Sequence, residues 1–425
     1  MANRYWVLIG STGSWNGTAL LKWSTTSGGA GGAAEPTSSD AVFFDGNSGA
    51  GTVTIATATA QCASVDFTGF TGTLAGSVDM WCFGSFTMST GMTRTWTGDL
   101  HLIEGTGGTI TSNGKTLASN VYLDDNAFGL DVTWTLGDAF STTGSLKLGS
   151  NTFACSTFNA TFDSLVNLGG STYKFSMAGG TTTFTGNNKT VSDSWADGNT
   201  NTGTCQLTYS GATGTRTFGV GAGGVHLNIT AGTDLLNLTG AVCKNLSFTG
   251  FTGTISAGTA TTVYGSLTMV SGMTVTSFSV STFAATTSET ITMAGKSFDG
   301  AVVFNGVGGT WTLQDAFTTT GSIKMTNGTL VTGGFAVSAT LFGLNAGTKT
   351  LTLSTTVPTL TTTNTTVWDA ATNGTNFTLT AFTGTIKFTG TANFTVTFAG
   401  NGKTYGNVWF ARGSSTGGNT TTGPN

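Results

Sequence analysis

The sequence predicts an all-β chain that folds as a parallel β-helix (β-solenoid) rod with an aromatic-rich N-terminal cap. Three observations predict this fold: a composition that favours strands and turns, short alternating segments, and long duplicated blocks. The chain has 425 residues, with 65 glycines, 3 prolines and 8% charged residues. Because Thr, Val, Phe and Trp favour strands, Gly and Asn favour turns, and helical periodicity is nearly absent, we expect strands throughout.

Charge and hydropathy argue against several classes of protein. The net charge is −4 and the pI about 5.0, and without a basic stripe no nucleic-acid partner is expected. No apolar run approaches the ~20 residues that a membrane-spanning helix needs, so no membrane insertion is expected. The first residues lack the apolar region of a secretory signal, so Sec export is not expected if Met1 is the native start.

The cysteines and histidines show no ligand pattern. The five cysteines are odd in number and contain no CxxC spacing, so we expect buried thiols rather than a disulfide framework or a zinc site. They are Cys62, Cys82, Cys155, Cys205 and Cys243. His101 and His226 also lack metal-ligand spacing, and we expect them at the surface or at rung edges. We expect no metal and no cofactor.

Long blocks of the chain occur twice. "QCASVDFTGFTGTLAG" at residues 61–76 returns as "VCKNLSFTGFTGTISA" at residues 242–257, so that Cys62 and Cys243 are 181 residues apart. Further on, "TWTLGDAFSTTGSLKL" from Thr133 and "TWTLQDAFTTTGSIKM" from Thr310 align with an offset of 177. Self-similar blocks of this kind are typical of solenoids, in which each layer buries its apolar face against its neighbours.

Short phrases such as "GTVTIAT", "TWTLGD" and "FTVTFAG" alternate apolar residues with threonine and end in turn residues. This is the period of a strand with one buried face. We expect like residues to stack from rung to rung, phenylalanine on phenylalanine. The expected segments are an N-terminal cap and entry loop over residues 1–50, solenoid block one over 51–240, solenoid block two over 241–410 and a Gly/Thr/Asn tail over 411–425.

Two other architectures remain open from the sequence. A β-propeller would have a period near 40–50 residues and antiparallel blades, and the two offsets show no clean sub-period of that size. A series of β-sandwiches would use tight Asn-Gly hairpins. Such dipeptides occur at Asn113-Gly114, Asn327-Gly328, Asn373-Gly374 and Asn401-Gly402.

Paired carboxylates could cleave a polysaccharide, and the acidic residues were considered for this role. The candidates are Asp99 with Glu104, Asp124 with Asp125, and Asp138 or its repeat partner Asp315. Because Asp138 and Asp315 are copied with the scaffold, we expect them to close turns rather than to catalyse. The "NGKT" phrases at Asn113 and Asn401 lack the first glycine and the helix of a phosphate-binding P-loop, so we expect β-turns there. No catalytic residue is therefore assigned.

Exposed aromatic side chains are the remaining candidates for binding. Tyr122, Tyr264 and Trp409 are predicted glycan contacts, with core packing as the alternative for each. The neutral Thr/Ser/Asn surface is expected to support broad, weak contact with glycans.

The N-terminal segment carries a resemblance to a known group of proteins. It reads Tyr5-Trp6-Val7, Gly13, Trp15, Trp23-Ser24, a glycine-rich loop, Pro36 and then Asp40-Ala41-Val42-Phe43-Phe44-Asp45. This phrase resembles the opening of β-solenoid structural and fibre proteins of tailed bacteriophages and, more loosely, that of bacterial surface β-helix adhesins. The later Gly-Lys-Thr/Ser phrases are similar to the rungs of the same group. The large aromatics are expected to plug the first rung.

The resemblance implies a non-enzymatic structural protein on the virion surface, such as a tail fibre or a head or tail decoration. Its implied partners are other virion structural proteins, further copies of the chain (trimers are common among such fibres) and a cell-surface glycan. Two alternatives stay open. One is a secreted bacterial adhesin or autotransporter-like passenger at the bacterial surface, and the other is a polysaccharide-degrading tailspike.

Overall fold

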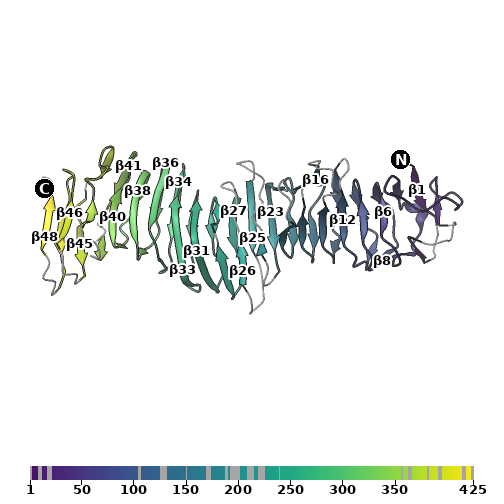
Figure 1. Ribbon diagram of the computed structural model, residues 1–425, viewed down its shortest axis with the longest axis horizontal. Helices are drawn as coiled ribbons and strands as arrows, with labels where there is room; N and C mark the ends of the chain where they lie inside the picture. Colours follow the sequence, from purple (N-terminus) through teal and green to yellow (C-terminus); the bar gives the residue numbers. More distant parts are fainter. Residues whose placement is uncertain are drawn as a thin grey trace. The chain divides into compact units, whose positions relative to one another are not determined.

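The structure is a computed structural model of the 425-residue chain (Figure 1). It describes residues 2–7, 12–16, 22–103, 107–124, 132–149, 151–168, 174–186, 190–191, 202–207, 215–218, 225–238, 240–355, 358–361, 366–380, 382–390, 395–413 and 418–422.

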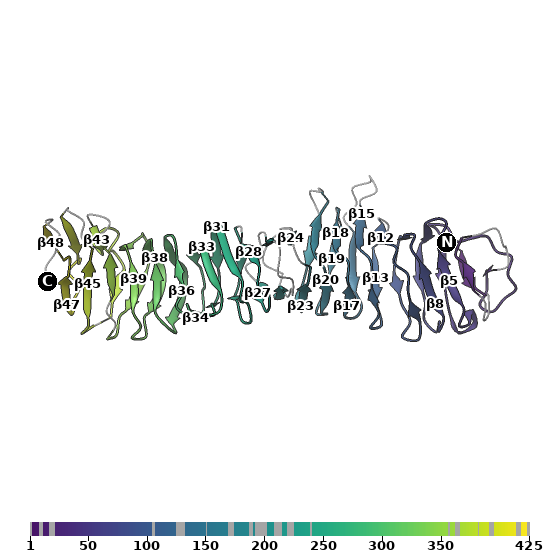
Figure 2. The same ribbon diagram turned by 90° about the horizontal axis from the view of Figure 1, so that it is seen from below.

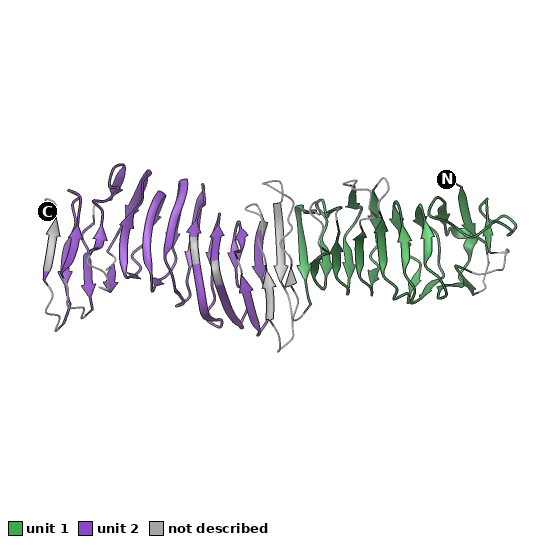
Figure 3. Ribbon diagram, viewed as in Figure 1, with its two compact units in different colours: residues 1–206 green, residues 207–425 purple. Residues whose placement is uncertain are grey.

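The chain divides into two compact units, Met1–Gln206 and Leu207–Asn425 (Figure 3). The first copy of the duplicated block lies in unit 1 and the second copy in unit 2. Each unit can therefore be compared with the other, residue by residue, as two versions of one scaffold.

The strands of unit 1 are short, and a single 3-10 turn, η1 (Gly46–Ser48), accompanies them. They are β1 (Asn3–Trp6), β2 (Gly13–Ser14), β3 (Trp23–Ser24), β4 (Ala41–Phe43), β5 (Thr52–Ile55), β6 (Ala60–Cys62), β7 (Ser64–Asp66), β8 (Thr73–Gly76), β9 (Met80–Cys82), β10 (Phe86–Thr87), β11 (Thr93–Arg94), β12 (Leu100–Ile103), β13 (Gly108–Thr111), β14 (Thr116–Leu117), β15 (Val121–Asp124), β16 (Thr133–Leu136), β17 (Phe140–Thr142), β18 (Leu146–Leu148), β19 (Thr152–Ala154), β20 (Ala160–Phe162), β21 (Leu165–Asn167), β22 (Lys174–Ser176), β23 (Ala178–Phe184), β24 (Thr190–Val191) and β25 (Thr202–Leu207), whose last residue belongs to unit 2.

The strands of unit 2 include several longer ones. They are β26 (Thr215–Phe218), β27 (Val225–Ile229), β28 (Leu235–Leu238), β29 (Val242–Cys243), β30 (Leu246–Ser247), β31 (Thr254–Val263), β32 (Leu267–Thr268), β33 (Thr274–Phe283), β34 (Ser288–Thr292), β35 (Ser297–Phe298), β36 (Val302–Leu313), β37 (Phe317–Thr319), β38 (Ser322–Val331), β39 (Val337–Ala339), β40 (Leu341–Leu344), β41 (Lys349–Thr352), β42 (Thr359–Thr361), β43 (Thr366–Asp369), β44 (Phe377–Leu379), β45 (Thr385–Thr389), β46 (Val396–Ala399), β47 (Asn407–Phe410) and β48 (Asn419–Thr422).

The strands of each unit stack as a parallel β-solenoid, as the sequence predicts. In unit 1 one ladder runs β1, β4, β7, β10, β13, β16, β19 and β22, each strand pairing in parallel with the next. In unit 2 a comparable ladder runs β35, β37, β39, β42, β45 and β47. Because the repeated strands pair in parallel across rungs, neither a propeller nor a series of hairpin sandwiches describes the fold.

Alternation along each strand builds the core. In β5 and β9, for example, apolar residues that point inward are fully buried, whereas the residues between them reach the surface. Stacking of like on like is confirmed in both units: the rings of Phe153 and Phe175 are 6.1 Å apart and nearly parallel, and those of Phe283 and Phe304 are 5.2 Å apart. This interior is what holds the outward-facing residues in register.

The duplicated blocks reproduce the same internal geometry. Phe67 and Phe70 have ring centroids 6.1 Å apart at an interplanar angle of 43°, and Phe248 and Phe251, 181 residues later, are 6.1 Å apart at 46°. Both copies thus keep the same core contact in separate units. The structural correspondence between the copies follows the sequence alignment.

Aromatic residues close the N-terminal end of unit 1, which confirms the predicted cap. Trp6, Trp15, Trp23 and Phe44 are buried and surround one another at ring distances between 5.2 and 5.8 Å. Strand β3 runs antiparallel to β1 and covers its edge. This is the expected way to protect the first layer of a solenoid, whose edge would otherwise be open.

Asp40 ties the first strand to the cap. Its carboxylate accepts hydrogen bonds from Thr37 (backbone N at 3.1 Å, hydroxyl at 2.9 Å) and from the backbone of Ala2, and it lies 3.7 Å from the Arg4 guanidinium. Burial by itself would raise the pKa of Asp40, but the hydrogen bonds from Thr37 and the charge of Arg4 lower it. Asp40 therefore stays ionised and holds the start of the chain in place.

Candidate functional site

The carboxylates copied with the scaffold close turns, as predicted. Asp138 accepts hydrogen bonds from the backbone N of Ser112 (2.7 Å) and of Asn113 (2.5 Å), in the turn one rung earlier. Asp315 does the same to Met293 (2.7 Å) and Ala294 (2.5 Å).

Both turns need a carboxylate because their backbone is unusual. Asn113 and Gly114 have φ values of 48° and 75°, and Ala294 and Gly295 have 50° and 76°. In this left-handed conformation the exposed N–H groups find no partner in the strand ladder, so the carboxylate of the next rung satisfies them. The "NGKT" phrases are therefore β-turns, as expected.

We expect Asp138→Ala and Asp315→Ala each to lower the free energy of unfolding of its own unit by about 2 kcal/mol, because each leaves two turn N–H groups without an acceptor. Hydrogen exchange at residues 112–115 and 293–296 measures the loss for each unit separately. Asn at either position keeps one acceptor oxygen and should cost less. A large cost at one position and none at the other would contradict the shared role.

The other predicted carboxylate pairs do not assemble in the described residues. Asp99 accepts hydrogen bonds from the backbone and side chain of Asn120 at 2.9 and 3.2 Å, at a corner between rungs. Its predicted partner Glu104 lies outside the described residues, as do Asp125 and the side chain of Asp124. Asp99 thus has a structural partner in the next rung.

The thiols and His226 are buried to different degrees. Cys62, Cys82, Cys155 and Cys243 are free and buried, as predicted, and the side chain of Cys205 lies outside the described residues. Burial raises the pKa of Cys155 and of Cys243 to about 12, so these thiols stay protonated. His226 is half-buried on β27, and burial, followed by the charge of Lys244, lowers its pKa.

Neither a metal cluster nor a membrane-spanning helix occurs in the part of the chain that the structure describes. No group of three or more His, Cys, Asp or Glu side chains there could hold a metal ion. The described ranges likewise contain no helix with the length and apolar character to cross a bilayer.

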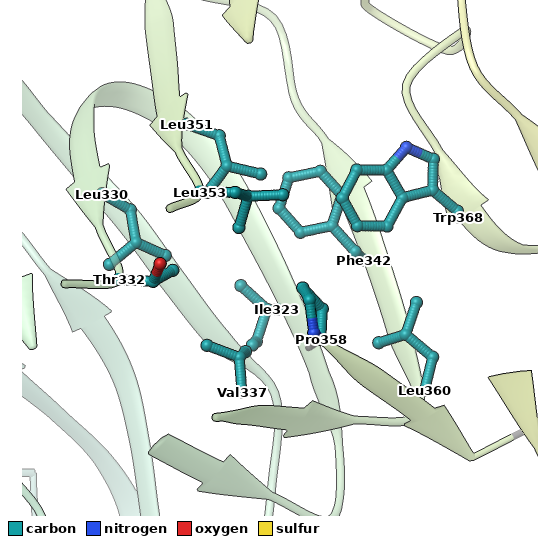
Figure 4. A pocket seen from close by; sticks show the side chains of 10 residues that line it. All are labelled: Ile323, Leu330, Thr332, Val337, Phe342, Leu351, Leu353, Pro358, Leu360 and Trp368. Carbon is teal, nitrogen blue, oxygen red and sulfur yellow. The ribbon is translucent and has the colours of Figure 1, made fainter. Parts of the chain in front are cut away.

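One cavity lies inside unit 2 and is lined by apolar side chains (Figure 4). Its volume is about 20 Å³, roughly the space that one water molecule occupies. The lining residues are Ile323, Leu330, Thr332, Val337, Phe342, Leu351, Leu353, Pro358, Leu360 and Trp368. It is a packing defect of the core and offers no room for a substrate.

The outward side of four neighbouring strands of unit 1 carries a continuous row of large side chains. Strands β9, β12, β15 and β18 pair in parallel, and Trp81, His101, Tyr122 and Lys147 occupy matching positions on them. Figure 2 shows β12, β15 and β18 side by side. We call these four residues the aromatic row. Each is flanked by fully buried apolar residues, as in Met80-Trp81-Cys82, so the strand period turns the central side chain outward.

The side chains of the aromatic row contact one another along the stack. The rings of His101 and Tyr122 are 4.4 Å apart and within 7° of parallel, whereas Trp81 is tilted by 49° at 6.0 Å from His101. The Lys147 ammonium donates a hydrogen bond to the Tyr122 hydroxyl and lies 4.4 Å from the ring centroid. Four side chains thus form one ordered strip across the strands.

The end of the strip at Trp81 is the more open one. Trp81 is 36% exposed, while the other three members are half-buried. The Asp79 side chain, 44% exposed, places Oδ2 3.5 Å from Nε2 of His101. A carboxylate and an open indole therefore lie together at this end, and an ammonium lies at the other.

The duplicated unit lacks this row, although it keeps the same register. The equivalent positions in unit 2 hold Thr262, Thr282, Val303 and Lys324, which pair in the same order on β31, β33, β36 and β38. Small β-branched residues are sufficient for the scaffold at the first three positions. The aromatic side chains of unit 1 are therefore not needed to build the solenoid.

The three predicted glycan contacts do not form one site. Tyr122 lies in the aromatic row of unit 1. Tyr264, 43% exposed, follows β31, and Trp409, 55% exposed, lies on β47 with the Lys387 ammonium 4.6 Å from its ring centroid. Within unit 2, Tyr264 and Trp409 are separated by several rungs.

Sequence reasoning missed Trp81, Asp79 and Lys147, and placed His101 at the surface without a partner. A signal was present in the triplets Met-Trp-Cys, Leu-His-Leu, Val-Tyr-Leu and Leu-Lys-Leu, each an outward residue between two inward ones. Reading these triplets as successive rungs would have aligned all four.

The fold and this strip define a repeat protein of the parallel β-solenoid class with an exposed aromatic row. Comparison with family models, with curated proteins and with solved structures finds no match to the chain.

Proposed function

We propose that this chain is a non-enzymatic structural protein of a virion surface appendage, a phage tail fibre or a head or tail decoration, and that it adheres to cell-surface glycans. The resemblance of residues 4–45 to phage solenoid proteins supports the location and the partnership with other virion proteins and further copies of the chain. Parallel stacking supports a structural role, because every rung is hydrogen-bonded to its neighbours.

The observation that carries the adhesive role is the aromatic row. Exposed aromatic side chains that the scaffold does not need are typical of a binding surface. The aspartates copied with the scaffold act as turn closers, which favours binding without catalysis.

We expect Trp81→Ala to weaken glycan binding about tenfold, because it removes the most exposed aromatic contact, worth about 1.4 kcal/mol. Affinity electrophoresis or calorimetry with host surface polysaccharide measures the effect. Thr262→Ala at the equivalent position of unit 2 is the matched control and should change nothing. Equal binding by both variants would overturn the proposed role of the row.

Two further measurements separate this proposal from its alternatives. Negative-stain microscopy of purified particles with an antibody against the chain should label the virion surface, and label on bacterial cells alone would favour a secreted adhesin. New reducing or unsaturated ends after incubation with the polysaccharide would instead favour a tailspike that degrades it.

A further inference from the structure

The aromatic row fixes how a ligand can lie on it. Its four positions lie on successive strands, three steps of about 4.8 Å that together span roughly 14 Å across the strands. Since His101 and Tyr122 are stacked face to face at 4.4 Å, no sugar ring can enter between them. A ligand must therefore run along the stacking direction, over the ring edges, and touch one side chain in each rung.

The Trp81 end suits an uncharged sugar. The indole is exposed and tilted away from its neighbour, so it can accept the apolar face of a sugar ring. The half-exposed carboxylate of Asp79 lies beside it and can accept hydrogen bonds from hydroxyl or amide groups. The same carboxylate would repel an acidic sugar bound here.

The Lys147 end suits an anion. Among the described residues, the ion pairs are those of Arg4 with Asp40 and of His101 with Asp79, and neither includes Lys147. The hydrogen bond to the Tyr122 hydroxyl holds the ammonium at the end of the row and leaves two of its three N–H groups for a ligand. A carboxylate is the group that such an ammonium binds most strongly.

Resting on the proposed glycan-binding function, we propose that the aromatic row recognises a linear polysaccharide in which uncharged and acidic sugars alternate. An uncharged residue lies on Trp81 beside Asp79, and an acidic residue further along the chain pairs with Lys147. A polymer that is acidic at every residue meets repulsion at Asp79, and a neutral polymer leaves Lys147 without a partner.

The test uses the full chain and three oligosaccharides of equal length. Hyaluronan oligosaccharides alternate acidic and uncharged sugars, oligogalacturonate is acidic throughout, and chitin oligosaccharides are neutral. We expect hyaluronan to bind at least tenfold more tightly than the other two, with an affinity that falls as salt is added. Lys147→Met should weaken hyaluronan binding about tenfold and leave chitin binding unchanged.

Two variants complete the design. Lys324→Met removes the equivalent lysine of unit 2, where no aromatic neighbours stand, and should leave every affinity unchanged. Asp79→Asn keeps the acceptor oxygen that holds the backbone of Asp99 at 2.9 Å but removes the charge, so it should improve oligogalacturonate binding several-fold.

The outcomes distinguish this inference from the proposed function. If the neutral or the uniformly acidic oligosaccharide binds the wild-type chain as tightly as hyaluronan, and Lys147→Met changes nothing, the ligand class is wrong while glycan binding stands. If none of the three oligosaccharides and no host polysaccharide binds, both proposals fail.

Discussion

Phe44→Ala is expected to lower the free energy that holds the N-terminal cap on unit 1 by about 4 kcal/mol. Phe44 is fully buried, and its ring lies against those of Trp6, Trp15 and Trp23 on the cap side and 4.6 Å from Phe67 on the next rung. Truncation would leave a cavity at the one place where cap and solenoid meet.

The loss should be local because a solenoid unfolds from its ends, where each layer has a neighbour on one side only. Hydrogen exchange and limited proteolysis should therefore show opening of residues 2–45 before the rungs beyond β7. A global loss of structure with no earlier opening of the cap would contradict this account.

Phe43 is the matched control, one residue away on the opposite face of β4. It is half-buried and stacks on Tyr5 at 4.9 Å outside the core. Phe43→Ala should cost about 1 kcal/mol or less, since it removes one partly exposed aromatic pair and leaves no interior cavity. Equal effects of the two substitutions would show that aromatic content, and not burial in the plug, sets the stability of the cap.

Duplication made the interior predictable from the sequence. Residues such as Phe67 and Phe248 share both an offset and an environment, because a layer can be copied only if it fits the layer beneath it. The turn role of Asp138 and Asp315 was predictable for the same reason.

The aromatic row was harder to predict because the rungs differ in length. Trp81, His101, Tyr122 and Lys147 are separated by 20, 21 and 25 residues, since insertions in the turns change the spacing without changing the strand register. No fixed period brings the four together, so Tyr122 was identified alone and Trp81 was missed. The alignment of a solenoid surface depends on its turns, which the hydrophobic pattern does not specify.

Lys349 was also invisible in the sequence, because its partners are backbone groups. It begins β41 and is 1% exposed. Its ammonium donates to the carbonyl oxygens of Asn345 (2.6 Å), Gly347 (2.8 Å), Asn373 (2.8 Å) and Thr375 (3.3 Å). One buried cation thus joins two turns on neighbouring rungs.

We expect Lys349→Met to lower the free energy of unfolding of unit 2 by about 4 kcal/mol. The methionine fills a similar volume but donates no hydrogen bonds, and each buried carbonyl left without a donor costs about 1–3 kcal/mol, part of which relaxation of the turns recovers. Chemical denaturation followed by tryptophan fluorescence measures the loss. Hydrogen exchange should show it first at residues 345–352 and 373–379.

Two controls test whether the ammonium itself is responsible. Lys324→Met alters an exposed lysine of the same unit and should change stability by no more than about 0.5 kcal/mol. Lys349→Ala opens space beside the four carbonyls, so methylammonium chloride should stabilise this variant more than sodium chloride does, because a bound amine restores the missing donors. If Lys349→Met is as stable as the wild type, or if methylammonium has no selective effect, the two turns are held together by packing and the cation is dispensable.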